Sequence, residues 1–254
     1  MTKQRRLSRK EKRRQARDSE HLVGILNQKF AMRQITPLTV SQSDLFNSYK
    51  EGKNLAAVGT AGTGKTMCGM YLAMQDVMTK HQYEKIVIIR SAVQTREQGF
   101  MPGSQAEKAA VFEAPYQDIA NDLFGRKDAY QILKQKGMIE FMTSSFVRGL
   151  TFDNAVILVD ECQSMTYHEL DTIITRVGES SRIVFCGDTK QDDLATNRNR
   201  ADISGLGDFI GVLNNIPSFK TVQFTVDDIV RSGLVKEYII AKEKVLEADR
   251  KSVV

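Results

Sequence analysis

The segment Gly59–Thr66 has residue types and a spacing suited to holding phosphate. Its sequence, GTAGTGKT, satisfies the pattern G-x-x-x-x-G-K-[ST], in which glycines let backbone N–H groups point at phosphate oxygens. In this pattern Lys65 contacts the β- and γ-phosphates, and the Thr66 hydroxyl is a ligand of Mg²⁺. We therefore predict a site for a nucleoside triphosphate and Mg²⁺, made by Gly59, Thr60, Ala61, Gly62, Thr63, Gly64, Lys65 and Thr66.

Two adjacent carboxylates, Asp160 and Glu161, follow the apolar run AVILV. They can supply a second group for the metal and a group for the attacking water, which the phosphate-binding loop at Gly59–Thr66 (the P-loop) lacks. Asp160 is expected at the carboxyl end of a buried strand, beside the P-loop, where it can bind Mg²⁺ through water. Glu161 points differently and is placed to polarise an attacking water. This pair predicts hydrolysis of the bound triphosphate.

Two glutamines are further candidates for contacts with the nucleotide. Gln191, in the segment GDTKQ after another apolar run, is a candidate sensor of the γ-phosphate or the lytic water; a simple strand-ending turn is the alternative. Gln42 precedes the P-loop and could contact the adenine edge through its paired donor and acceptor. For the Ser41-Gln42 pair, a helix N-cap by Ser41 is the alternative.

Three arginines stand where a cation could meet phosphate. Arg231 and Arg148 are rival candidates for a residue that neutralises charge in the transition state, with ordinary salt bridges as the alternative. Arg90 ends the run IVIIR and precedes a Gly/Pro loop containing Phe100, which suits backbone contacts and base stacking with single-stranded nucleic acid. A solvated loop or an oligomer contact explains that segment equally well.

The elements that must position these residues alternate along the chain. Short apolar runs predict strands, and longer amphipathic stretches between them predict helices. Continuous apolar strands separated by helices indicate an α/β fold with a mainly parallel sheet and helices on both faces. The expected strands are 54–58, 85–90, 139–144, 155–160, 182–188 and 221–225, and the expected helices are 21–31, 65–79, 106–124, 128–136 and 167–177.

Charge is unevenly distributed over the 254 residues. Residues 1–17 hold nine Lys/Arg against one Glu, or +8, so the remaining residues sum to −3 of the total +5. Such an arm displaces counterions from nucleic acid; a solubilising terminus is the alternative. We expect a basic, flexible arm over 1–20 and one domain over 21–254. The absence of an apolar secretory stretch or an 18-residue apolar run favours a soluble, cytoplasmic protein, and three scattered cysteines indicate free thiols.

With these motifs in view, the chain resembles the PhoH-like P-loop ATPase family, from about Thr39 to about Glu243. The resemblance is carried by GTAGTGKT, IIRSA followed by GFMPG, VRGLTFDNAVILVDECQ, GDTKQDDL, SGL and FTVDDIVRSGLVKEYI. It implies a single RecA-like P-loop NTPase core related to superfamily 1 helicases, with ATP and Mg²⁺ as ligands and a link to RNA metabolism. Cys162 stands where the family usually has alanine, a small-for-small change.

The favoured hypothesis is a Mg²⁺-dependent ATPase coupled to single-stranded RNA or DNA, with helicase activity as one form of coupling. The alternative is an ATP-binding switch or scaffold that acts on a protein partner without motor activity. A chain of this length has room for one core, so a motor would complete its ATP site with a neighbouring subunit. This predicts a homo-oligomer, such as a ring, in which Arg231 or Arg148 reaches the next subunit's ATP site.

Overall fold

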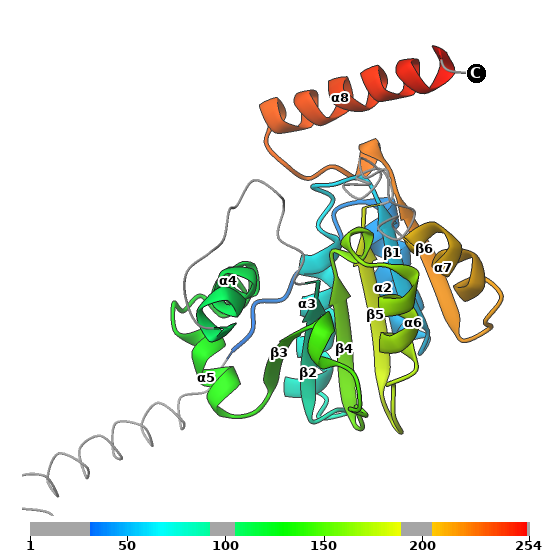
Figure 1. Ribbon diagram of the computed structural model, residues 1–254. Coiled ribbons are helices and arrows are strands. Elements are labelled where there is room, and N and C mark those ends of the chain that lie inside the picture. Colours follow the sequence, from blue (N-terminus) through cyan, green and yellow to red (C-terminus); the bar gives the residue numbers. More distant parts are fainter. Residues whose placement is uncertain (1–30, 92–104, 189–204, 253–254) are drawn as a thin grey trace, which may run out of the picture.

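The computed structural model describes residues 31–91, 105–188 and 205–252, and within them a six-stranded sheet forms the centre of the molecule (Figure 1). The strand order is β3-β2-β4-β5-β1-β6, and every paired strand is parallel to its neighbour. The strands are β1 (Asn54–Gly59), β2 (Lys85–Arg90), β3 (Ile139–Thr143), β4 (Ala155–Asp160), β5 (Arg182–Gly187) and β6 (Phe219–Phe224).

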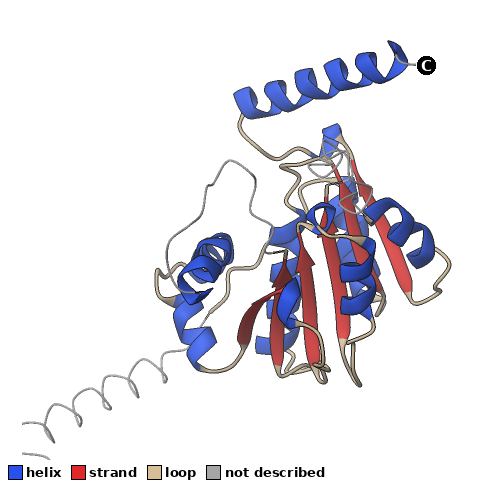
Figure 2. Cartoon of the chain, viewed as in Figure 1, coloured by secondary structure: helices blue, strands red, loops and turns tan. Residues whose placement is uncertain are grey.

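Helices cover both faces of this sheet (Figure 2). One face packs against α2 (Val40–Lys50), α3 (Lys65–Met78), α4 (Gln105–Phe124) and α5 (Ala129–Gln135). The other packs against α6 (Tyr167–Ile174) and α7 (Leu206–Leu213). The last helix, α8 (Gly233–Ser252), lies beyond the end of the sheet where the strands' carboxyl ends gather (Figure 1). Short 3₁₀ turns are η1 (Ser144–Phe146), η2 (Cys162–Ser164) and η4 (Val226–Asp228).

The sequences of the central strands are unbroken apolar runs because both faces of these strands are buried. In β4, Val156 and Leu158 belong to the core under α3, whereas Ile157 and Val159 belong to the core under α6. Successive side chains of a strand point to opposite faces, so a strand covered on both sides cannot alternate with polar residues. The predicted α/β class, with a parallel sheet and helices on both faces, is confirmed.

The strand order decides which loops meet. β5 lies between the P-loop strand β1 and the strand β4 that ends at Asp160. The carboxyl ends of all three strands therefore lie at one edge of the sheet, where ligands bind in open α/β folds. This arrangement is that of a RecA-like P-loop core.

The helices differ in part from those expected from the sequence. Thr39, not Ser41, caps α2, accepting from the Gln42 N–H at 3.3 Å. A helix at α2 was anticipated only through the alternative of a cap at Ser41, because α2 is largely polar. The helices α7 and α8 were not among those expected, and α7 is short and apolar like a strand. The basic arm and the helix expected over 21–31 lie outside the described residues.

Two further observations concern the cysteines and membrane spans. Cys68, Cys162 and Cys186 are free and buried, as predicted. Among the residues that the structure describes, no helix is both long and apolar enough to cross a bilayer.

Candidate functional site

The P-loop joins β1 to α3, and its glycines adopt backbone angles that other residues avoid. Gly62 and Gly64 lie in the left-handed region, at φ +74° and +81°. Gly59 has φ +124°, and a Cβ on it would lie 2.0 Å from the Phe224 carbonyl oxygen of β6. Only glycine avoids both the strain and the clash, so the sequence motif is explained by local geometry.

Lys65 opens α3 and is buried within the loop. Its Nζ donates to the carbonyl oxygens of Gly59 (2.9 Å) and Thr60 (2.7 Å), and to the Thr63 hydroxyl (3.3 Å). Burial lowers the pKa of this ammonium, and the nearby Asp188 and Asp160 partly oppose that effect. The cation is thus held by neutral acceptors at the N-terminus of a helix, where phosphate is favoured.

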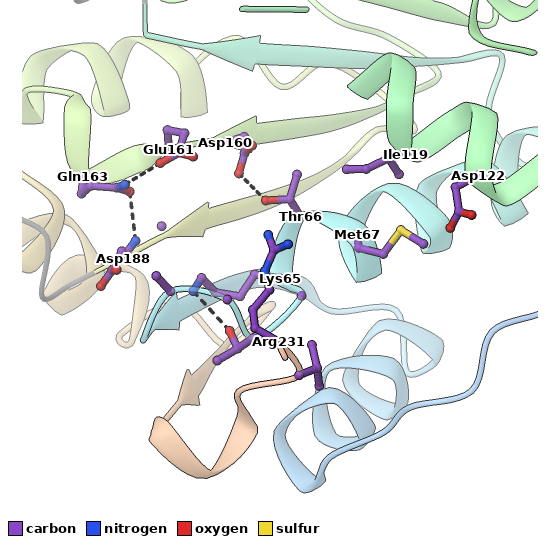
Figure 3. Close-up of a pocket in the computed structure, with 16 residues that line it drawn as sticks. Lys65, Thr66, Met67, Ile119, Asp122, Asp160, Glu161, Gln163, Asp188 and Arg231 are labelled. Carbon is purple, nitrogen blue, oxygen red and sulfur yellow. Dashed lines mark hydrogen bonds between the residues drawn. The ribbon is translucent and has the colours of Figure 1, made fainter. Parts of the chain in front are cut away.

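Asp160 ends β4 and faces the P-loop across β5. Its carboxylate accepts from the Thr66 hydroxyl at 2.8 Å (Figure 3). It also accepts from the Tyr116 hydroxyl of α4 at 2.8 Å. Burial, and next the charge of Glu161, raise the pKa of Asp160; the two hydroxyl hydrogen bonds and Arg90, its register partner on β2, act in the other direction. A buried carboxylate held against the P-loop threonine is what the sequence predicted for a metal-binding pair.

Glu161 is directed differently from Asp160 by its backbone. It has φ 54° and ψ 43°, a left-handed conformation that is uncommon for a non-glycine residue. Its carboxylate accepts from Gln163 Nε2 at 2.6 Å, and Gln163 Oε1 accepts from the Asp188 N–H at 2.9 Å (Figure 3). Gln163 therefore ties the carboxylate after β4 to the end of β5.

Comparison with known proteins assigns the chain to a family. A sequence profile of the family described as PhoH-like protein matches residues 34–243, which is most of the chain. The chain belongs to the PhoH-like family. The PhoH-like protein of Mycobacterium tuberculosis H37Rv is 32% identical over 208 residues, which cover 82% of this chain and 57% of that protein. The PhoH-like protein of Bacillus subtilis 168 is 31% identical over 207 residues, covering 81% and 63% respectively.

The PhoH-like chain thus spans a little more than half the length of those relatives.

Among solved structures, the large terminase of a thermophilic bacteriophage in complex with ADP aligns at 12% identity. The alignment covers 80% of this chain and 49% of that chain, with a TM-score of 0.49.

In the PhoH-like chain, Arg231 lies in the P-loop pocket of its own subunit. The Val230 N–H donates to the Gly62 carbonyl at 3.2 Å, and Arg231 Cγ lies 3.0 Å from where a Cβ on Gly62 would stand. Arg231 was expected to face a neighbouring subunit. Within the chain it lies against its own P-loop, because the segment after β6 turns back over that loop. A contact of Arg231 with a neighbouring subunit stays a prediction.

Helix α8 continues this return over the loop. The Thr60 hydroxyl donates to Glu243 Oε1 at 2.9 Å, and Ile239 Cδ1 lies 3.5 Å from the Cβ position of Gly62. The parts of the chain that follow β5 and contact the P-loop therefore include β6, the segment at Val230 and Arg231, and α8.

Gln42 lies beside the P-loop, but its amide is already engaged. Its Oε1 accepts from the Leu38 N–H at 2.8 Å, and its Nε2 donates to the Thr63 carbonyl at 2.9 Å. The residue is 4% exposed. These two bonds use one lone pair of Oε1 and one N–H of Nε2, and the contact with adenine that the sequence predicted stays a prediction.

The remaining candidates fall elsewhere. Arg148 lies 2.9 Å from His168 Nε2, in a small pocket with Ser144 and Glu169, and does not line the P-loop pocket. Arg90 stacks over the Phe112 ring at 5.7 Å. Gln191 and Phe100 lie outside the described residues.

Sequence reasoning missed three residues of the site. Gln163 could have been noticed as the polar residue two positions after Glu161. Asp188 was noted only as part of a turn, although its backbone N–H closes the link to Gln163. Tyr116 has no motif around it, since only the packing of α4 brings its hydroxyl to Asp160.

Proposed function

We propose that this PhoH-like chain is a Mg²⁺-dependent ATPase whose hydrolysis is coupled to single-stranded nucleic acid. The observation that supports it most strongly is the Thr66–Asp160 hydrogen bond of 2.8 Å. It joins a P-loop hydroxyl to a strand-end carboxylate across an intervening strand, and these are the two protein groups that P-loop NTPases use around the metal.

The residues present fit Mg²⁺. The donor set is a hydroxyl and a carboxylate, both hard oxygen ligands, and Mg²⁺ commonly takes its other ligands from water and phosphate. When bound, Mg²⁺ neutralises charge on the β- and γ-phosphates.

The chain's own residues divide the remaining work. Lys65 binds and neutralises the β- and γ-phosphates after leaving its contacts with Gly59 and Thr60. Glu161 accepts a proton from the attacking water, and Gln163 holds its carboxylate in place. Arg231, in the same pocket, is placed to neutralise charge on the phosphates of its own chain's nucleotide.

Coupling to single-stranded nucleic acid is supported by charge rather than by a described interface. Residues 1–17 bring a net charge of +8 to a chain whose remainder sums to −3. Such a cluster binds polyanions by counterion release, without needing a fixed fold.

One assay tests the proposal: ATP turnover with Mg²⁺, measured alone and with single-stranded RNA or DNA. Lys65→Ala should abolish turnover, since it removes both phosphate binding and charge neutralisation. Lys53→Ala is the matched control, because its ammonium bonds the Pro217 carbonyl on the surface and should leave turnover unchanged. Near-wild-type turnover by Lys65→Ala would contradict the P-loop assignment, and stimulation by neither polymer would remove the nucleic-acid coupling.

A nucleotide-dependent switch without motor activity is the second candidate. The contact between the P-loop residue Thr60 and Glu243 favours it, because α8 would then respond to events at the phosphates. ATP binding and hydrolysis that neither RNA nor DNA alters would select this alternative.

A further inference from the structure

The P-loop lines a cavity of about 740 Å³, a volume typical of sites for small molecules. Its two ends differ in chemistry. One end is acidic, with Asp160, Glu161 and Asp188 at the strand ends. The other is made by Met67 of α3 and by Ile119 and Asp122 of α4, on the side of the P-loop away from Glu161 (Figure 3).

The Thr66–Asp160 bond gives a bound triphosphate its direction. Because these two groups would hold the metal between the β- and γ-phosphates, the terminal phosphate faces the acidic end. The rest of the molecule must leave the P-loop by another route. Met67 directly follows Thr66 in the first turn of α3, and it lies on the wall that leads to Ile119.

The two apolar side chains at this end suit a flat ring system. Met67 and Ile119 are partly buried, and both pack against the core cluster that α3 and α4 share. When a ligand covers apolar atoms that are partly exposed in a cavity, the removal of their surface from water favours binding. Methionine adapts to the shape of such a ligand through its flexible thioether.

Asp122 adds a polar group at the rim of the same end. Its carboxylate accepts from Arg33 at 3.0 Å, and its side chain remains 59% exposed. The Arg33 N–H also donates to the Leu123 carbonyl at 2.7 Å, which fixes the preceding segment against α4. A carboxylate at this point disfavours phosphate and offers an acceptor to hydroxyl groups.

Gln42, which the sequence predicted to contact the adenine edge, is buried beside the P-loop. Both ends of the Gln42 amide bond the chain itself, at Leu38 and Thr63. Gln42 is not among the residues that line this cavity.

We propose that Met67 and Ile119 form the nucleoside subsite of this cavity, with Asp122 accepting from the ribose hydroxyls. The proposal rests on the proposed ATPase function, since it takes the triphosphate to lie on the P-loop. It identifies these three side chains as the reason the site prefers a nucleotide to a bare polyphosphate.

Calorimetric binding of two probes, ATP and inorganic tripolyphosphate, tests this in the presence of Mg²⁺. Tripolyphosphate has the charges of the phosphate chain and lacks the nucleoside. We expect the double variant Met67→Ser/Ile119→Ser to bind ATP about tenfold more weakly while its affinity for tripolyphosphate changes less than about twofold. Asp122→Ala should weaken ATP binding and should not weaken tripolyphosphate binding.

Matched controls lie on the same helix. Val111→Ser removes an exposed apolar side chain of α4, and Asp118→Ala removes an exposed carboxylate; neither residue lines the cavity. Both should bind the two probes like the unaltered chain. If the double variant still binds tripolyphosphate, its P-loop is folded. Asp122→Ala changes an exposed side chain and therefore tests the same subsite without altering the core.

The other outcomes overturn the subsite in distinguishable ways. Equal affinity of the unaltered chain for the two probes, or unchanged ATP binding by both sets of variants, removes the nucleoside subsite and leaves the P-loop assignment intact. Parallel loss of both probes in the double variant shows that Met67 and Ile119 act on the loop instead. An unaltered chain that binds neither probe contradicts the proposed function as well.

Discussion

Asp160 and Glu161 are neighbours in sequence, yet the structure gives their carboxylates different partners. Asp160 faces the hydroxyls of Thr66 and Tyr116, whereas Glu161 faces the amide of Gln163. The left-handed backbone at Glu161 produces this divergence, because it turns the chain directly after the strand. Two adjacent acids can therefore serve two purposes.

Glu161→Gln tests this division of roles. The amide keeps the shape of the side chain but cannot accept a proton, so ATP should still bind while hydrolysis falls about 100-fold or more. Single-turnover hydrolysis and equilibrium ATP binding measure the two effects separately. Glu140→Gln, a half-exposed carboxylate of β3 paired with Lys85, is the control. A loss of Mg²⁺-ATP affinity equal to that of Asp160→Asn, without a separate hydrolysis defect, would merge the two roles.

Asp160→Asn should make the protein more stable in the absence of nucleotide. Because burial raises the pKa of Asp160 in the folded chain, its ionised form opposes folding. Protonated Asp160 contributes to stability at low pH, and this contribution is lost as the pH rises through the raised pKa of the folded chain.

Thermal melts from pH 4 to pH 8 measure this effect. Asp160→Asn should melt at a higher temperature than the unaltered chain near pH 8, and the difference in Tm should narrow toward pH 4. Asp171→Asn, at an exposed position of α6, should show no such trend. A gap that widens toward acid would mean that ionised Asp160 stabilises the fold.

At the scale of elements, α8 depends on the P-loop for its position. Its apolar residues Leu234 and Tyr238 are exposed at 79% and 66%, so burial contributes little at those positions. The described contacts to the core include the bond of Glu243 to Thr60 and the packing of Ile239 near Gly62. A helix held by few contacts opens at low free-energy cost.

Glu243→Ala should loosen α8. Losing a hydrogen bond to a charged acceptor costs about 1 kcal/mol at a partly exposed site, which corresponds to about fivefold faster amide exchange in 233–245. Hydrogen-exchange mass spectrometry measures the rate, with Glu237→Ala, exposed on the same helix, as the control. Equal exchange in the two variants would show that Glu243 does not hold the helix.

At the scale of the whole molecule, the position of Arg231 bears on whether the ATP site needs a second subunit. Its side chain lies against Gly62 of the same chain, so the pocket contains the P-loop with Lys65, the Arg231 cation and four carboxylates, all from one chain. The sequence-based expectation, from a chain with room for one core, was that the arginine reaches a neighbour's site, and that expectation stays a prediction beside the same-chain arrangement.

A mixing experiment decides between the two arrangements. Arg231→Ala should lower ATP turnover about 100-fold or more while leaving ATP binding nearly intact. Mixing it with Lys65→Ala chains should restore no turnover, because each chain then carries a defect in its own pocket. Recovery on mixing, in samples shown by mass photometry to contain both variants together, would establish shared sites.

The sequence alone determined the features whose physics is local. A P-loop needs glycines, a lysine and a threonine at adjacent positions, and a buried parallel strand needs an unbroken apolar run, so Gly59–Thr66, Asp160 and most strand bounds could be predicted from short windows. The tertiary structure alone decided which distant groups meet. β5 is inserted between β1 and β4, and this places Gln163 against Asp188. Packing of α4 brings Tyr116 to Asp160, and the return of the chain after β6 sets Arg231 on Gly62. These contacts join residues far apart along the chain, and their partners follow from strand order and helix packing, which no local pattern contains.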